Sequence, residues 1–98
     1  MSETVTTRTV IVADPAGVHI RSALAIAQVV RRGRSRVTIV KGLQRVEAAE
    51  VLQVTTLVAE QGDELTIEAV GPDAAAVLDA IELLLAGQFG DANEDKPS

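Results

Sequence analysis

The single histidine of this 98-residue chain, His19, stands between a predicted turn and a predicted apolar helix. The turn ends at Gly17, and Arg21 follows two residues after the histidine. The first N–H groups of a helix have no intrahelical partner and lie at the positive end of its dipole, so they favour a bound phosphate. A neutral imidazole carries a lone pair that can attack phosphorus, and a guanidinium pairs well with phosphate oxygens. The pattern therefore predicts a phosphoryl-carrying site, with His19 as the nucleophile and Arg21 as the phosphate clamp.

A histidine at a helix start is, on residue type alone, more often a surface or capping residue than a nucleophile. The flanking segments decide between these readings. In order they are G-V-H-I-R-S (17–22), an apolar helix, S-R-V-T-I-V (35–40), V-E-A-A-E-V-L (46–52) and E-Q-G-D-E-L-T-I-E-A-V-G-P-D-A (60–74). From about Thr7 to Leu85 this order resembles the HPr phosphocarrier family of the bacterial sugar phosphotransferase system, whose histidine motif is G-[LI]-H-[AT]-R-P.

The resemblance implies roles for the two residues of the motif. His19 would accept a phosphoryl group on its ring Nδ1 from Enzyme I and pass it to enzyme IIA-type proteins, while Arg21 pairs with the phosphate. This is a stoichiometric phosphoryl relay rather than an enzyme, and it needs no cofactor and no metal. The alternative is an HPr-like regulatory protein, in a nitrogen-type branch or an incomplete phosphotransferase system, that acts by phosphorylation-dependent protein binding.

Two residues depart from the family's pattern. Ser22 replaces the proline of the motif, and either its N–H and hydroxyl donate to a phosphate on His19 or its side chain caps the helix. Glu50 stands where many HPr proteins have a serine that a dedicated kinase phosphorylates, so switching through that serine is lost here. Glu50 is either a partial mimic of phosphoserine or a carboxylate that stabilises a helix start. We favour the second reading, because one charge replaces nearly two.

The resemblance also implies a partner-docking surface around the histidine. Its members are Ile20, Leu24, Val51, Leu52, Gln53 and Thr55. Exposed apolar residues beside a reactive group commonly mark an interface, whereas ordinary core packing is the alternative, above all for Val51. Gln28 and Gln53 stand where many HPr proteins have lysine, so we expect weaker attraction to acidic partners.

A basic cluster lies at the end of the first helix. It comprises Arg31, Arg32, Arg34 and Arg36. Cations are favoured at the C-terminal end of a helix, so we interpret this cluster as a solvated helix end.

Composition excludes several other classes of protein. The chain has no cysteine, so it can form neither a disulfide nor a thiol nucleophile, and Phe89 is its only aromatic residue. A net charge of −5 and this lack of stacking side chains argue against a nucleic-acid partner. No apolar run approaches the roughly 20 residues that span a bilayer, and residues 1–4 lack the features of a signal peptide. We therefore expect a cytoplasmic monomer without membrane insertion.

The apolar pattern predicts four strands and three helices. Strands are expected at 7–12, 37–40, 44–48 and 65–70, and helices at 20–32, at 50–57 and from a cap at Asp73 to a stop at Gly87.

One amphipathic face per element implies an α+β open-faced sandwich of the order βαββαβα, in which three helices cover one face of a four-stranded sheet. The resemblance adds an antiparallel sheet in the order first, fourth, second, third. Residues 1–87 are expected to form the HPr-like domain, and the acidic residues 88–98 a flexible tail.

Overall fold

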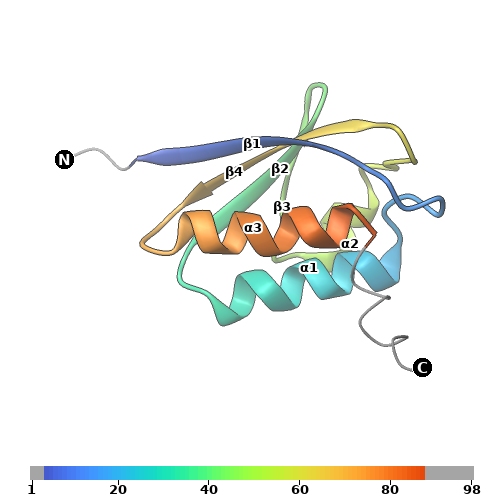
Figure 1. The fold of residues 1–98 in the computed structure, drawn as a ribbon. Coiled ribbons are helices and arrows are strands. Elements are labelled where there is room, and N and C mark those ends of the chain that lie inside the picture. Colours follow the sequence, from blue (N-terminus) through green and yellow to red (C-terminus); the bar gives the residue numbers. More distant parts are fainter. Residues whose placement is uncertain (1–3, 88–98) are drawn as a thin grey trace, which may run out of the picture.

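In the computed structural model, which describes residues 4–87, a sheet and three helices form two layers (Figure 1). The elements are β1 (Val5–Ile11), α1 (Ile20–Arg32), β2 (Arg36–Lys41), β3 (Gln44–Glu47), α2 (Val51–Thr55), β4 (Glu64–Val70) and α3 (Ala74–Leu85). The four strands form one antiparallel sheet in the order β1-β4-β2-β3. The predicted fold class and strand order are therefore confirmed. The tail expected at 88–98 lies outside the described residues.

The central strand β4 shows how the sheet separates core from solvent. Leu65, Ile67 and Ala69 are fully buried, while the residues between them are only half-buried. Alternate side chains of a strand point to opposite faces, so these three lie on the face that the helices cover. Each buried Leu or Ile side chain contributes roughly 1.5–3 kcal/mol, so burial of this face is the main stabilising term in a chain without disulfides.

The two long helices each bury an apolar stripe at helical spacing. Ala23, Ile26, Ala27 and Val30 are buried on α1, and Val77, Leu78, Ile81 and Leu85 on α3, while Leu84 is only partly buried. At the end of α1, Gly33 packs closely against α3, since a Cβ there would lie 2.9 Å from both an Asp73 carboxylate oxygen and a Val77 methyl group. No helix within residues 4–87 is long and apolar enough to cross a membrane.

The side chain of Asp73 does not have its predicted role. Asp73 is the N-cap residue of α3, but its side chain makes no capping hydrogen bond. Its carboxylate instead accepts hydrogen bonds from the Ser35 hydroxyl and, at 3.0 Å, from the Arg34 N–H, both in the connection between α1 and β2. These bonds, that of Ser35 first, hold the pKa of Asp73 below its ordinary value of 3.8. The aspartate therefore joins two segments instead of capping one helix.

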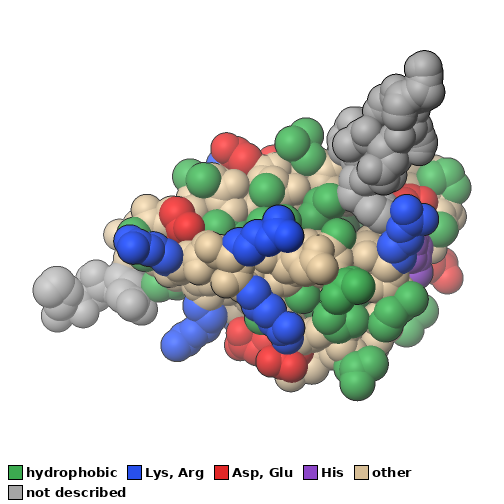
Figure 2. Space-filling view, turned by 90° about the horizontal axis from the view of Figure 1, so that it is seen from below, with side chains coloured by type: hydrophobic (Ala, Val, Ile, Leu, Met, Phe, Trp, Pro, Cys, Tyr) green, Lys and Arg blue, Asp and Glu red, His purple; other side chains and the backbone are tan. Residues whose placement is uncertain are grey.

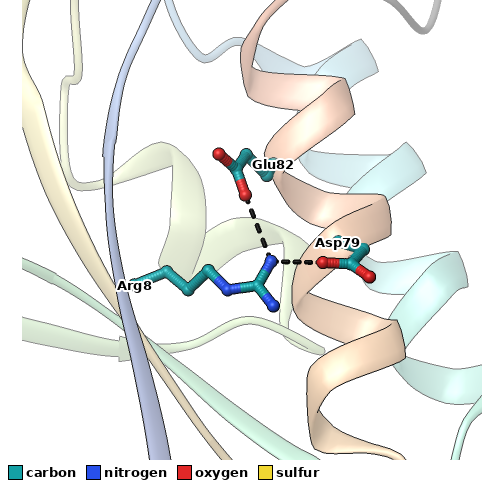
Figure 3. A network of polar contacts seen from close by, with 3 residues as sticks. All are labelled: Arg8, Asp79 and Glu82. Carbon is teal, nitrogen blue, oxygen red and sulfur yellow. Dashed lines mark hydrogen bonds and ion pairs between the residues drawn. The ribbon is translucent and has the colours of Figure 1, made fainter.

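An ionic contact fixes α3 to the edge strand β1. Arg8 donates hydrogen bonds to Asp79 and, at 3.2 Å, to Glu82 (Figure 3). The two carboxylates are three residues apart on α3 and so share one face of the helix. Hydrogen bonding, chiefly to Asp79, raises the pKa of Arg8 above its ordinary value. This contact links the C-terminal half of α3 to β1.

Candidate functional site

His19 is the N-cap residue of α1 and ends the loop that leaves β1. Its backbone is extended, with φ −123° and ψ −177°, and its side chain is half-buried. Arg21, in the first turn of α1, is exposed. In Figure 2 the histidine lies at the margin of the helical face with a basic side chain beside it. The structure thus brings the predicted nucleophile to a helix N-terminus that can be reached from solvent.

The loop before the histidine is held at both ends by the rest of the fold. The Ala13 N–H donates to the carbonyl of Leu85 at the end of α3 at 3.0 Å, and the Val18 N–H donates to the carbonyl of Ala59 at 2.9 Å. The Gln61 amide also donates to the Ala13 carbonyl at 3.1 Å. Nothing in the sequence indicated these supports, although Gln61 lies in the segment 60–74 that carries part of the family resemblance.

Gly17 is needed for this arrangement in two ways. Its φ is +71°, in the left-handed region that favours glycine, and a Cβ there would lie 2.4 Å from the carbonyl oxygen of Ala59. No side chain fits at that distance. Gly17 is therefore more than the turn residue that the sequence predicted, because it lets the histidine loop lie directly on the segment after α2.

The Ser22 hydroxyl bonds to the main chain of His19. Ser22 is only 3% exposed, and its Oγ accepts from the His19 N–H at 2.9 Å and donates to the His19 carbonyl at 3.0 Å. The two residues form the ends of a capping box. The Ala23 N–H also donates to the His19 carbonyl, at 2.8 Å, as the first bond of the helix.

The residues expected to dock partners lie on α1 and α2, which contact each other. Ile20, Leu24 and Leu52 are 57%, 48% and 74% exposed. Figure 2 shows exposed hydrophobic side chains gathered on the helical face near the histidine. Val51 is half-buried and packs against the core, so for this residue the structure favours core packing over partner docking.

The polar residues of α2 bond mainly to nearby main chain. The Gln53 amide oxygen accepts from the Glu47 N–H at 3.1 Å, and the Thr55 hydroxyl donates to the Leu52 carbonyl at 2.7 Å. Glu50 is exposed at the N-cap of α2, and its side chain makes no capping hydrogen bond. Gln53 and Thr55 thus stabilise the short helix locally, whereas the Glu50 carboxylate faces solvent.

One member of the basic cluster joins the two helices that carry the exposed apolar residues. Arg31 donates to the carbonyl of Ala49, just before α2, at 2.7 Å. Arg31 is exposed in the last turn of α1, as expected of a solvated helix end, and its guanidinium also links the start of α2 to α1.

Comparison with known proteins identifies the family. Residues 6–87 match the family model described as "PTS HPr component phosphorylation site". The chain belongs to the HPr family. It is 39% identical over 82 residues to Phosphocarrier protein HPr of Treponema pallidum, an alignment that covers 84% of this chain and 93% of that protein. It is also 34% identical over 86 residues to Phosphocarrier protein NPr of Shewanella violacea, covering 88% and 94%.

Solved structures of the HPr family have the same fold. The crystal structure of Phosphocarrier Protein HPr from Bacillus anthracis is similar with a TM-score of 0.78 at 25% identity, over 82% of this chain and 95% of that one. Together with the sequence relatives, this supports a phosphocarrier role in phosphoryl transfer by the phosphotransferase system.

Proposed function

We propose that this chain is a phosphoryl relay that accepts a phosphoryl group from Enzyme I on His19 and passes it to enzyme IIA-type proteins. The observation that supports it best is the position of His19 at the N-cap of α1, inside the segment that matches the HPr family. A ring nitrogen attacks phosphorus, a new N–P bond forms, and the bond between phosphorus and its donor atom breaks. The N–H groups of the first turn then favour the bound phosphate.

Arg21 is proposed to pair with that phosphate. Its guanidinium is exposed, two residues after the nucleophile, and its planar fork suits phosphate oxygens. A relay must release the group that it accepts, so binding the phosphate too tightly would slow the second transfer. An exposed arginine in solvent meets this requirement better than a buried one.

The exposed apolar residues are proposed to contact both kinds of partner. Ile20, Leu24 and Leu52 supply the apolar part of a docking surface beside His19. Transfer needs donor and acceptor nitrogens in line with phosphorus, so a shared surface that orients each partner in turn is sufficient. We place this relay in the cytoplasm, with the chain acting as a monomer and without a cofactor.

Glu50 is proposed to have no regulatory role. Its carboxylate lies at the start of α2, where a negative charge is mildly favourable, and a glutamate cannot be phosphorylated. Regulation of this chain by phosphorylation would then depend on His19 alone.

A second candidate function is regulation, since a phosphocarrier named NPr is related to this chain beside those named HPr. In that case the chain belongs to a nitrogen-type branch or an incomplete phosphotransferase system and acts by binding targets according to the phosphorylation state of His19, so binding rather than onward transfer is its main output. The chemistry at His19 is the same in both cases, so only the fate of the phosphoryl group distinguishes them.

A two-step transfer experiment tests the relay. The chain is phosphorylated with labelled phosphoenolpyruvate and Enzyme I, purified, and mixed with an enzyme IIA protein. A relay transfers the label, whereas a regulatory protein that binds without passing its phosphate retains it. Arg21→Ala should slow both steps by about tenfold, the lower end of what loss of one hydrogen bond to a charged group costs. Arg32→Ala, at the opposite end of α1, is the matched control and should leave both rates unchanged.

A further inference from the structure

The chain differs from its family's motif at Ser22, and the structure assigns this residue a definite set of contacts. Its hydroxyl accepts one hydrogen bond from the His19 N–H and donates one to the His19 carbonyl. A hydroxyl has a single proton to donate, and here that proton is used within the turn. A second donation, to a phosphate on the His19 ring, would require the bond to the carbonyl to break.

The burial of Ser22 agrees with this. The residue is 3% exposed, whereas the neighbouring Arg21 is open to solvent. A phosphoryl group that arrives on Enzyme I approaches the exposed side of the loop. Ser22 therefore lies on the inner side of the His19 main chain, away from the solvent from which Enzyme I approaches.

We propose that Ser22 is a positioning residue that fixes the main chain of His19 and does not donate its hydroxyl to the phosphate. The inference rests on the proposed relay function only for its effect on transfer rate. The Val18 N–H is bonded to Ala59, and the hydroxyl of Ser22 holds the next peptide group at the His19 N–H. Two successive amides are thus held, which limits the directions available to the imidazole before phosphate arrives.

Two substitutions separate positioning from direct contact with phosphate. Ser22→Ala removes the hydroxyl and leaves the turn free to move. Ser22→Pro removes the hydroxyl and also the Ser22 N–H that donates to the His19 side chain in the capping box, but it fixes φ near −65° and is tolerated in the first turn of a helix, so it restrains the turn by other means. Circular dichroism and thermal melting check that both variants are folded.

The first measurement is solvent exchange of the His19 amide by NMR, which requires no phosphoryl transfer. In Ser22→Ala this exchange should become about fivefold faster, the factor expected for loss of one hydrogen bond. The Ala23 amide keeps its bond to the His19 carbonyl and is the internal control. Unchanged exchange at His19 would show that the hydroxyl does not hold this amide and would overturn the proposal.

The second measurement is the initial rate of phosphorylation by Enzyme I with phosphoenolpyruvate. Ser22→Ala should be about tenfold slower than the parent, and Ser22→Pro should recover to within about threefold of it. A proline variant as slow as the alanine variant would contradict positioning, because a restrained turn would then not replace the hydroxyl. A parent chain that takes up no phosphate would refute the relay function, while the exchange measurement would still test the contact to His19.

Discussion

Gly17→Ala should destabilise the fold through a collision that the structure defines. The Cβ of alanine would lie 2.4 Å from the Ala59 carbonyl oxygen and 3.0 Å from the Glu60 Cα, and both are main-chain atoms. The loop must therefore move away from the segment after α2. That movement stretches or breaks the 2.9 Å hydrogen bond from the Val18 N–H to Ala59.

The expected loss of unfolding free energy in Gly17→Ala has three contributions. A left-handed backbone costs alanine about 1–2 kcal/mol, and inserting a methyl group into a packed site costs about 1–3 kcal/mol more. Against this, alanine lowers the conformational entropy of the unfolded chain, which offsets about 0.4–1 kcal/mol. The middle of these ranges gives a net loss of unfolding free energy of about 3 kcal/mol, or a fall in Tm of roughly 12–24 °C at about 4–8 °C per kcal/mol.

Gly42→Ala is the matched control for Gly17→Ala. Gly42 has a similar φ of +59°, but no atom lies within 4 Å of the position its Cβ would take. It should therefore lose only about 1 kcal/mol, the backbone cost less the entropic offset. Urea denaturation of both variants measures the difference. Equal losses would refute the argument that close contact with Ala59 makes Gly17 necessary.

Three further predictions concern other parts of the fold. Val58 is an exposed β-branched residue with φ +50°, a conformation that asparagine tolerates better. Val58→Asn should therefore raise the unfolding free energy by about 1 kcal/mol, and no gain in urea denaturation would contradict the claim that the Val58 backbone is strained. Because hydrogen bonds lower the folded pKa of Asp73, its ionised form stabilises the fold at neutral pH and this contribution is lost as pH falls below 3.8. Ser35→Ala should flatten this acid dependence of Tm, and an unaltered profile would count against the contact. Leu24→Glu should weaken binding to Enzyme I about tenfold in calorimetry with Tm almost unchanged, whereas a large fall in Tm would place Leu24 in the core.

The elements of the fold could be predicted because each has a clear local pattern. The apolar spacing of α1 and α3 and the alternation in β4 correspond to buried faces in the structure. Boundaries were less accurate: β1 begins at Val5 rather than Thr7, and α2 spans only Val51–Thr55 instead of 50–57. Short elements are fixed by tertiary contacts, such as that of Arg31 with Ala49, which a local pattern does not contain.

The interactions that shape the site depend on residues far apart in the chain. Gly17 has a local turn signal, but its close contact with Ala59 exists only after the sheet forms. Asp73 has the local signal of a helix cap, yet its carboxylate bonds to Ser35, which precedes it by 38 positions. By contrast, His19 and Ser22 are only three positions apart, and for that reason a capping role for Ser22 could be suggested from the sequence, although the N-cap itself is His19.

Intact-mass measurement after incubation with phosphoenolpyruvate and purified Enzyme I tests the central claim most directly. The account predicts one added phosphoryl group that is lost in acid, as expected for a phosphohistidine, and none on His19→Ala, which should fold normally because the side chain is only half-buried. An unmodified parent chain, or a His19→Ala variant that still gains the phosphoryl group, would contradict it.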